Sequence, residues 1–281
     1  MLGRLRSALA ALLPARGPSV DQWLDQLGAD DARHRWEAAA ALQAHCSQDR
    51  VLSALVDALG DPHPFVRWQA VKSLSESQNP HTFDALVEAL STTNPRRRSA
   101  VADALGLLGD ARAIPFLCRA LDSRNEEVRC SAAEALGRLG HVEALPSLLG
   151  LIQDGNALVR HSAVNAVGDI GDPAAIPEVI PLLEDQAALV RSAAAEAVRK
   201  IGQPPRTPSL QRALEDADAG VRWHAVRALA VVGDEQDLPA LRGLLLDDTQ
   251  VFGTPIAETV QNAIKSIEQR RAAKAQRDAS E

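Results

Sequence analysis

The chain has 281 residues, of which 46% are hydrophobic but only 3% aromatic, and 37 acidic side chains outnumber 30 Lys and Arg, giving a net charge of -7. This balance disfavours a general nucleic-acid binder, because such proteins gather Lys and Arg to displace phosphate counterions. No apolar run approaches the roughly 18 residues of a membrane span, so a cytoplasmic protein is expected. The three Cys form no C-x-x-C pattern, which predicts reduced thiols and neither a metal site nor a disulfide framework.

Residues 1–18 are predicted to form a short amphipathic helix and a Pro/Gly linker. Leu2, Leu5 and Leu9 lie on one side of this helix, and Pro14 interrupts it. We expect the helix to cap the first repeat; docking on a membrane surface or on a partner is the alternative. Ser19 and Gln22 then predict a capping box at the start of the first repeat helix.

From residue 19 to about residue 268 the chain repeats itself with a period of 31 residues. The clearest marker is an Arg that recurs at Arg35, Arg67, Arg98, Arg129, Arg160, Arg191 and Arg222. Apolar residues at helical spacing after each Arg predict a helix. Gly109, Gly140, Gly171, Gly202 and Gly233 are each followed six residues later by a Pro. Gly suits a left-handed helix end and Pro suits a first helical turn, so the period predicts a helical solenoid.

The period predicts about eight antiparallel helix pairs in a single array over residues 19–268, and no strand. The pairs are 19–28/33–45, 49–59/64–76, 81–91/95–108, 113–121/126–139, 144–153/157–170, 176–184/188–201, 207–215/219–232 and 238–246/255–268. The last repeat, from about residue 238, is irregular because the loop from Thr249 to Pro255 is longer than the others. Pro181 is expected to bend its helix. The charged tail, residues 269–281, is expected to be disordered.

The pattern V-R-x-x-A-x-x-A-L-G-x-x-G, with a Pro-led first helix, resembles the short HEAT-like repeat of the type named after phycobilisome lyases. The resemblance implies an all-α fold, a right-handed α-solenoid or HEAT-like superhelix, whose inner concave wall binds partners. It also implies a ladder of ion pairs in which an Asp precedes the Arg by six residues. The matching pairs are Asp61/Arg67, Asp154/Arg160, Asp185/Arg191 and Asp216/Arg222. The units of Arg35, Arg98 and Arg129 lack that Asp, and the ladder is not expected there.

The candidate partner-binding residues lie opposite the apolar side of each second helix, at positions +1, +2, +5 and +9 after the Arg. The resemblance places these positions on the concave wall. The candidates are Trp36, Trp68, Lys72, Asp103, Cys130, Glu134, His161, Asn165, Glu196, Trp223, His224 and Arg227. Trp is enriched at interaction hot spots, and three of the four Trp stand at position +1.

Two further features of these positions shape the prediction. Small residues in the middle of the array, such as Ser99, Ser131 and Ser162, predict a floor on which a partner lies. Seven acidic side chains against four basic ones at the four positions predict a mildly acidic trough, suited to a neutral or basic segment. Alternatively, the N-terminal helix covers Trp36 and Trp68, and the loop with Phe252 covers Trp223.

These patterns favour a non-catalytic protein–protein interaction scaffold or chaperone-like adaptor. Its expected partner is a protein or peptide, including another repeat protein in a heterodimer, and it needs no cofactor. The resemblance offers an alternative, an E/F-type bilin lyase subunit or phycobiliprotein chromophore-handling protein, in which Trp223, His224 and Arg227 hold a tetrapyrrole. The absence of Tyr argues against it. A HEAT-like DNA-repair glycosylase shares the architecture but needs a basic groove. The chain also lacks the His-Glu pairs of iron-binding HEAT-like enzymes.

Overall fold

The structure, a computed structural model, describes residues 18–202 and 208–278, which are mostly helical. The predicted N-terminal helix lies outside the described residues. The chain separates into two compact units, residues 1–108 and 109–281. We describe each unit by itself.

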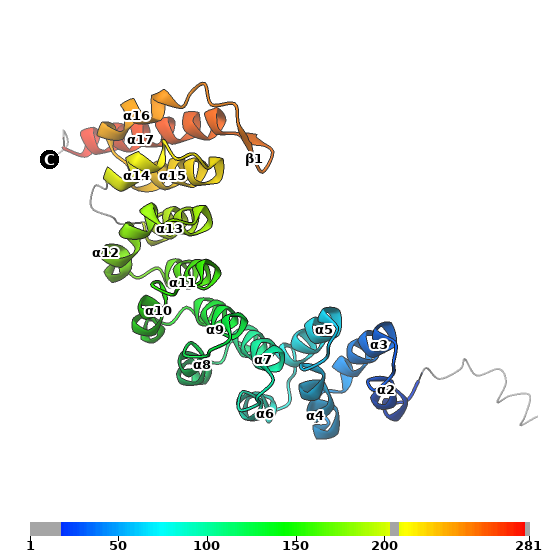
Figure 1. The fold of residues 1–281 in the computed structure, drawn as a ribbon. Helices are drawn as coiled ribbons and strands as arrows, with labels where there is room; N and C mark the ends of the chain where they lie inside the picture. Colours follow the sequence, from blue (N-terminus) through cyan, green and yellow to red (C-terminus); the bar gives the residue numbers. More distant parts are fainter. Residues whose placement is uncertain (1–17, 203–207, 279–281) are drawn as a thin grey trace, which may run out of the picture. The chain divides into compact units, whose positions relative to one another are not determined.

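The first unit contains three helix pairs within its described residues (Figure 1). They are α2 (Val20–Gln26) with α3 (Ala32–Leu42), α4 (Asp49–Ala58) with α5 (Pro64–Ser75), and α6 (Thr82–Ala89) with α7 (Pro95–Leu108). The second helices α3, α5 and α7 pack against one another in order. The predicted capping box is present: the Ser19 hydroxyl accepts from the Gln22 backbone N–H, and the Gln22 side chain accepts from the Ser19 N–H.

The second unit continues the same arrangement. Its pairs are α8 (Ile114–Ala120) with α9 (Glu126–Leu139), α10 (Leu145–Leu151) with α11 (Ala157–Ile170), α12 (Ile176–Val179) with α13 (Ala188–Ile201), α14 (Pro208–Ala213) with α15 (Ala219–Val232), and α16 (Leu238–Gly243) with α17 (Ile256–Asp278). The second helices again stack in chain order, α9 to α17, with the first helices on one side of them (Figure 1). The fold is therefore an α-solenoid, as the period predicts.

Local sequence explains where the helices begin and end. Asn125 and Asn156 cap α9 and α11 by accepting from backbone N–H groups, and Gly140 and Gly171 end these helices with φ of 71° and 74°. Gly233 differs from the expectation, because its φ is -71° and its backbone is extended. The chain leaves α15 directly into a second capping box, made by Asp234 and Asp237, so no left-handed turn is needed.

The second helices approach one another closely because their facing residues are small. A Cβ added at Gly137 would lie 2.8 Å from the Cα of Ala166, and one added at Gly168 would lie 2.9 Å from the Cα of Ala197. Alanines along these helices, such as Ala132 and Ala163, are fully buried. The core of each unit therefore consists of Ala, Leu, Val and Ile between closely packed helices.

Proline interrupts one first helix, at Pro181, where a bend is predicted. Helix α12 ends at Val179 and continues as a 3₁₀ helix, η5 (Ile180–Glu184), because Pro181 has no N–H to donate to the α-helical ladder. None of the described helices is long and apolar enough to cross a membrane.

The end of the described chain departs from the prediction twice. The loop after α16 contains a short antiparallel hairpin, β1 (Gln250–Val251) with β2 (Thr254–Pro255), where no strand is expected. Its two turn residues, Phe252 and Gly253, have φ of 52° and 79°, as two-residue hairpin turns require. Helix α17 continues to Asp278, so residues 269–278 are helical and not disordered, since their Ala, Arg, Lys and Gln residues favour helix.

Candidate functional site

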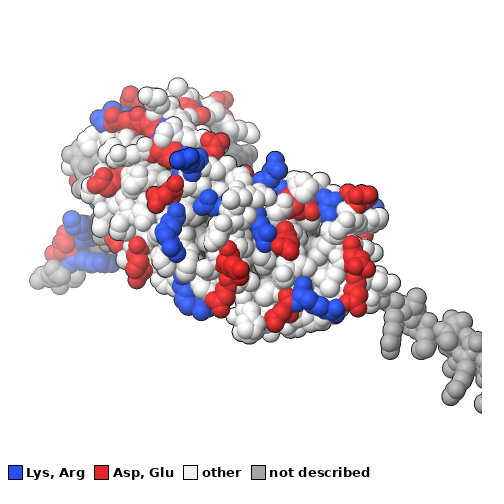
Figure 2. All heavy atoms as spheres, turned by 60° about the horizontal axis from the view of Figure 1, so that its bottom comes forward, with Lys and Arg blue, Asp and Glu red and all other residues white. Residues whose placement is uncertain are grey.

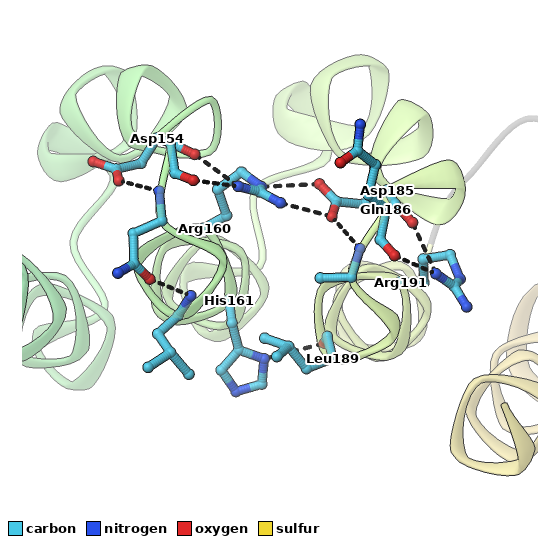
Figure 3. Close-up of polar contacts among 11 residues, drawn as sticks. Asp154, Arg160, His161, Asp185, Gln186, Leu189 and Arg191 are labelled. Carbon is cyan, nitrogen blue, oxygen red and sulfur yellow. Dashed lines mark hydrogen bonds and ion pairs between the residues drawn. The ribbon is translucent and has the colours of Figure 1, made fainter.

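The Asp and Arg residues of the predicted ladder join neighbouring repeats, but each carboxylate pairs with the Arg of the preceding repeat. The Nε and Nη2 atoms of Arg160 donate to the two carboxylate oxygens of Asp185, at 2.9 and 2.8 Å (Figure 3). The Nη1 atom of Arg160 donates to the backbone carbonyl of Asp154, at 2.8 Å. The Asp154/Arg160 pairing predicted within one repeat is therefore a backbone contact, and the ion pair spans two repeats.

The same arrangement recurs in both units. The ion pairs are Arg35–Asp61, Arg129–Asp154, Arg191–Asp216 and Arg222–Asp247, with nitrogen–oxygen distances of 2.7, 2.9, 2.7 and 2.9 Å. Arg35 and Arg129 take part although no Asp precedes them by six residues, because the carboxylate comes from the next repeat. Asp247 was not predicted, since the Arg-based pattern stops before it.

These ion pairs keep the aspartates charged. Burial by itself raises the pKa of Asp185, but hydrogen bonds from Arg160 and from the backbone N–H of Ala187 outweigh it, so the pKa lies below its ordinary value. The side chains of Arg160 and Asp185 are only 16% and 9% exposed, which limits screening by water. Bidentate pairs of this kind are strong and geometrically specific, so the ladder holds the repeats in register.

The prediction that Ser99, Ser131 and Ser162 form an open floor is wrong. Ser99, Ser131 and Ser162 are 5%, 9% and 5% exposed, and Gln69 at the same +2 position as Ser131 is 4% exposed. Because the second helices lie so close together, a side chain at position +2 faces the neighbouring second helix. Ser162, for example, donates to the carboxylate of Glu134 on the preceding second helix, at 3.1 Å. These residues pack repeats together and offer no open surface.

The central candidates at positions +1 and +5 are also engaged. His161 Nδ1 lies 3.1 Å from the carbonyl oxygen of Leu189 (Figure 3). Its Nε2 lies 2.9 Å from the Asn165 amide. Cys130 is half-buried, and burial raises the pKa of its thiol, which disfavours the reactive thiolate. Asp103 is half-buried on α7. Among the described residues, no three His, Cys, Asp or Glu side chains gather into a possible metal site.

Four of the C-terminal candidates form one compact group with Phe252, which we call the Trp223 cluster: Glu196, Trp223, His224, Arg227 and Phe252. The Arg227 guanidinium lies 4.4 Å from the centre of the Trp223 ring, and the Phe252 ring packs edge-on against Trp223 at 5.4 Å. Thus the hairpin loop does contact Trp223, as the alternative interpretation holds.

A half-buried carboxylate, that of Glu196, lies at the centre of this cluster. Glu196 lies 3.4 Å from Arg227 Nη1 and 3.4 Å from His224 Nδ1, and it accepts from Arg199 at 2.6 Å. Burial raises the pKa of Glu196, but the hydrogen bonds from Arg199 and His224 and the charge of Arg227 hold the pKa far below its usual range. The charged groups of the Trp223 cluster therefore satisfy one another.

The N-terminal candidates are arranged differently. Trp36 is 39% exposed, Trp68 is 56% exposed, and Phe65 beside them is 67% exposed. With Asp31, Ala32, Arg33 and His63 these three side chains line a groove of about 620 Å³ on α3 and α5, which we call the aromatic groove. Lys72 Nζ lies 5.8 Å from the centre of the Trp68 ring. Phe65 was not predicted; its signal was a large aromatic side chain directly after the Pro64 that starts the helix.

Charges are mixed on the surface. On the face drawn in Figure 2, Lys and Arg alternate with Asp and Glu over the described residues and form no continuous basic stripe. Such a stripe is the usual footprint of a nucleic-acid binder.

Comparison with known proteins agrees with the helix-pair architecture. A family model for HEAT repeats matches residues 20–106, 83–160, 149–217 and 206–261. Importin beta aligns over 89% of this chain and 41% of its own chain, with 14% identity and a TM-score of 0.63. The YibA protein of Escherichia coli aligns over 81% of this chain and 96% of its own, with 22% identity and a TM-score of 0.57.

The complex of CpcE and CpcF of phycocyanin lyase from Nostoc sp. PCC7120 aligns over 91% of this chain and 98% of its own, with 24% identity and a TM-score of 0.42. No curated protein matches the sequence significantly. At these identities importin beta and YibA show a shared fold alone.

Proposed function

This chain belongs to the family of HEAT repeats, and we propose that it is a scaffold that binds a protein or peptide through the aromatic groove of its first unit. The observation that carries the proposal is the joint exposure of Trp36, Phe65 and Trp68 along one groove. Trp and other large aromatic side chains dominate binding energy at protein interfaces. In this scaffold the groove holds a partner and performs no chemistry.

Both the size and the composition of the groove suit such a partner. Its volume of about 620 Å³ is that of a site for one or two large side chains or a short peptide. Covering apolar surface gains roughly 25 cal/mol per Å², and contiguous exposed apolar patches commonly mark interaction sites. Another repeat protein is one kind of partner that could supply such a segment.

The bilin-lyase alternative has less support from the site. It would place a tetrapyrrole against Trp223, His224 and Arg227, and the polar groups of His224 and Arg227 already contact Glu196. We therefore favour a protein or peptide partner and a function without a cofactor. We also place this function in the cytoplasm, because Cys46, Cys118 and Cys130 are all unpaired, as in a reducing compartment.

The test uses a displayed library of random 12-residue peptides, selected on the purified full chain. We expect selected peptides to carry large apolar residues, and we expect the Trp36→Ala/Trp68→Ala variant to bind them at least tenfold more weakly. Leu246→Ala is the matched control, because Leu246 is 93% exposed but lies in the second unit. Circular dichroism checks that each variant folds. The proposal is wrong if no peptide is selected or if the double variant binds as tightly as the unchanged chain.

A further inference from the structure

The ladder of ion pairs is interrupted in the first unit at Arg67, the residue directly before Trp68. In four other rungs the Asp that pairs with an Arg lies 25 residues after it, as Asp185 does after Arg160. The residue 25 positions after Arg67 is Thr92. Thr92 has no carboxylate to offer, so this rung lacks its acidic partner.

An aspartate in the ladder accepts from a backbone N–H in its own turn and also pairs with an Arg, and Thr92 provides only the first of these contacts. Its hydroxyl accepts from the backbone N–H of Asn94 at 3.3 Å, just as the Asp185 carboxylate accepts from the N–H of Ala187 at 2.8 Å. The turn is therefore kept. The second carboxylate oxygen, which in the other rungs faces the guanidinium, has no equivalent in a threonine.

Arg67 itself is held as the other ladder arginines are. Its Nη1 donates to the backbone carbonyl oxygens of Asp61 and Pro62, at 2.9 and 3.1 Å, and its side chain is partly exposed. Arg160 makes the equivalent bonds to Asp154 and Gly155. Within the described part of the chain, however, Arg67 forms no ion pair. Its Nε and Nη2, the atoms that donate to Asp185 in the case of Arg160, have no hydrogen-bond partner among the described residues.

The charges beside the aromatic groove are unevenly satisfied. Arg67 directly precedes Trp68 on α5, and Lys72 follows Trp68 by about one turn, so both cations lie within roughly 8 Å of each other along the helix axis. Lys72 also forms no ion pair in the described residues. In contrast, Glu37 pairs with Arg33 at 2.8 Å, and the Asp31 carboxylate accepts from the Arg33 N–H without an ion pair in the described residues. The unpaired charges on either side of Trp68 along α5 are thus positive.

We propose that the segment bound in the aromatic groove is acidic, and that one of its carboxylates fills the open rung on Arg67. This inference rests on the proposed function and specifies its partner: an apolar anchor for Trp36, Phe65 and Trp68, with an Asp or Glu next to it. It replaces the neutral or basic partner that the charge count of all repeats predicts, because most acidic side chains in that count are distant from the groove or already paired.

The test supplies the missing carboxylate from within the chain. Thr92→Asp would occupy Arg67 as Asp185 occupies Arg160, and Thr92→Asn keeps the turn acceptor without the charge. The probes are one acidic peptide from the selection described above and its counterpart with Asp→Asn and Glu→Gln changes, both fluorescein-labelled. Binding is measured by fluorescence anisotropy. We expect Thr92→Asp to weaken binding of the acidic peptide about tenfold and to leave binding of the amide peptide unchanged. Thr92→Asn should change neither.

Arg67→Gln gives a second route to the same result, because it removes the guanidinium and should also abolish the preference for the acidic peptide. The inference is overturned if the acidic and amide peptides bind the unchanged chain equally well, if basic peptides are selected, or if Thr92→Asp leaves the preference intact. When any of these occurs while the Trp36→Ala/Trp68→Ala variant still loses binding, only the inference fails. Failure of that double variant to lose binding would instead remove the proposed function.

Discussion

Tryptophans at the same repeat position have opposite environments in the two units. Trp68 in the first unit is 56% exposed, and the cations on either side of it in α5 form no ion pair in the described residues. Trp223 in the second unit is covered by Phe252, and its neighbour Arg227 pairs with Glu196. A position in the repeat therefore does not determine whether a side chain binds a partner. What matters is whether neighbouring side chains include an aromatic ring that covers the Trp and a carboxylate that pairs with the adjacent cation.

The ladder of ion pairs is also more complete in the second unit than in the first. Four Arg–Asp rungs follow one another in the second unit, from Arg129–Asp154 to Arg222–Asp247. The first unit has only the rung Arg35–Asp61 among its described residues, because Arg67 and Arg98 are followed 25 residues later by Thr92 and Ser123, which carry no carboxylate. Satisfied charges favour stability, and unsatisfied ones are available for binding. The second unit thus has the features of a support and the first unit those of a recognition surface.

The largest expected difference between the two units is in how strongly acid lowers their stability. The pKa values of Asp154, Asp185, Asp216 and Asp247 lie below the ordinary value in the folded chain. A carboxyl with a lowered folded pKa stabilises the fold above its unfolded pKa of about 3.9, and this contribution is lost as pH falls through the folded pKa. The urea midpoint of the second unit should therefore fall more steeply between about pH 5 and pH 2 than that of the first.

Tryptophan fluorescence can follow the units separately, because Trp223 is the only Trp in residues 109–281. A variant with Trp23, Trp36 and Trp68 changed to Phe reports on the second unit, and Trp223→Phe reports on the first. Parallel acid sensitivity of the two signals would contradict the difference in ladder content.

Removing one guanidinium from each unit tests the ladder directly. Arg160→Ala should lower the free energy of unfolding by about 3 kcal/mol, because it leaves the nearly buried Asp185 carboxylate without its partner. The matched change Arg67→Ala should cost only about 1 kcal/mol, since it removes backbone contacts but no ion pair. Urea denaturation at pH 7 measures both. Equal losses would mean that the rung at Arg67 is already filled.

Trp223→Ala should destabilise the second unit by about 2 kcal/mol, because it removes the ring on which Phe252 and Arg227 pack. Trp36→Ala should change the unfolding free energy of the first unit by less than about 0.5 kcal/mol, as expected for an exposed side chain. Thermal melts followed by circular dichroism compare the two. A large loss from Trp36→Ala would indicate that the aromatic groove serves packing.

The smallest expected effect is an increase in the stability of the first unit. Thr92→Asp should stabilise the first unit by about 1 kcal/mol, because the new carboxylate can accept from both Asn94 and Arg67. Thr92→Asn is the control, with the turn bond but no charge. If the two variants have the same urea midpoint, the guanidinium of Arg67 is not positioned as its backbone contacts indicate.

Much of the fold could be predicted because the repeat encodes it locally. Gly140, Pro146 and the apolar spacing after Arg129 each specify a helix end, a helix start or a buried face within one repeat. Each of these signals lies within a few neighbouring residues, and the same signals recur in most repeats. The helix pairs accordingly agree with the structure to within a few residues, except that α17 runs from Ile256 to Asp278 and so passes its predicted end at residue 268.

The site was less predictable because it depends on contacts between repeats. Whether Ser162 is open or buried follows from how closely α9 and α11 approach, and the partner of Arg160 lies 25 residues away in the next repeat. Likewise, the ring that covers Trp223 comes from a hairpin that breaks the period. Spacing within one repeat cannot encode these relations, which explains why Trp36 and Trp68 were identified but Phe65 and Thr92 were missed.

The contact between glycine and alanine on adjacent second helices also sets the pitch of the stack. At Gly137 a single added methyl group would collide with the backbone of Ala166, so the two helices would have to tilt or separate. Every repeat that follows within the second unit would be carried along by that displacement. One methyl group at such a position therefore changes the spacing or tilt between adjacent repeats. Exchanges between Gly and Ala there would alter the curvature of the solenoid while leaving its surface residues unchanged.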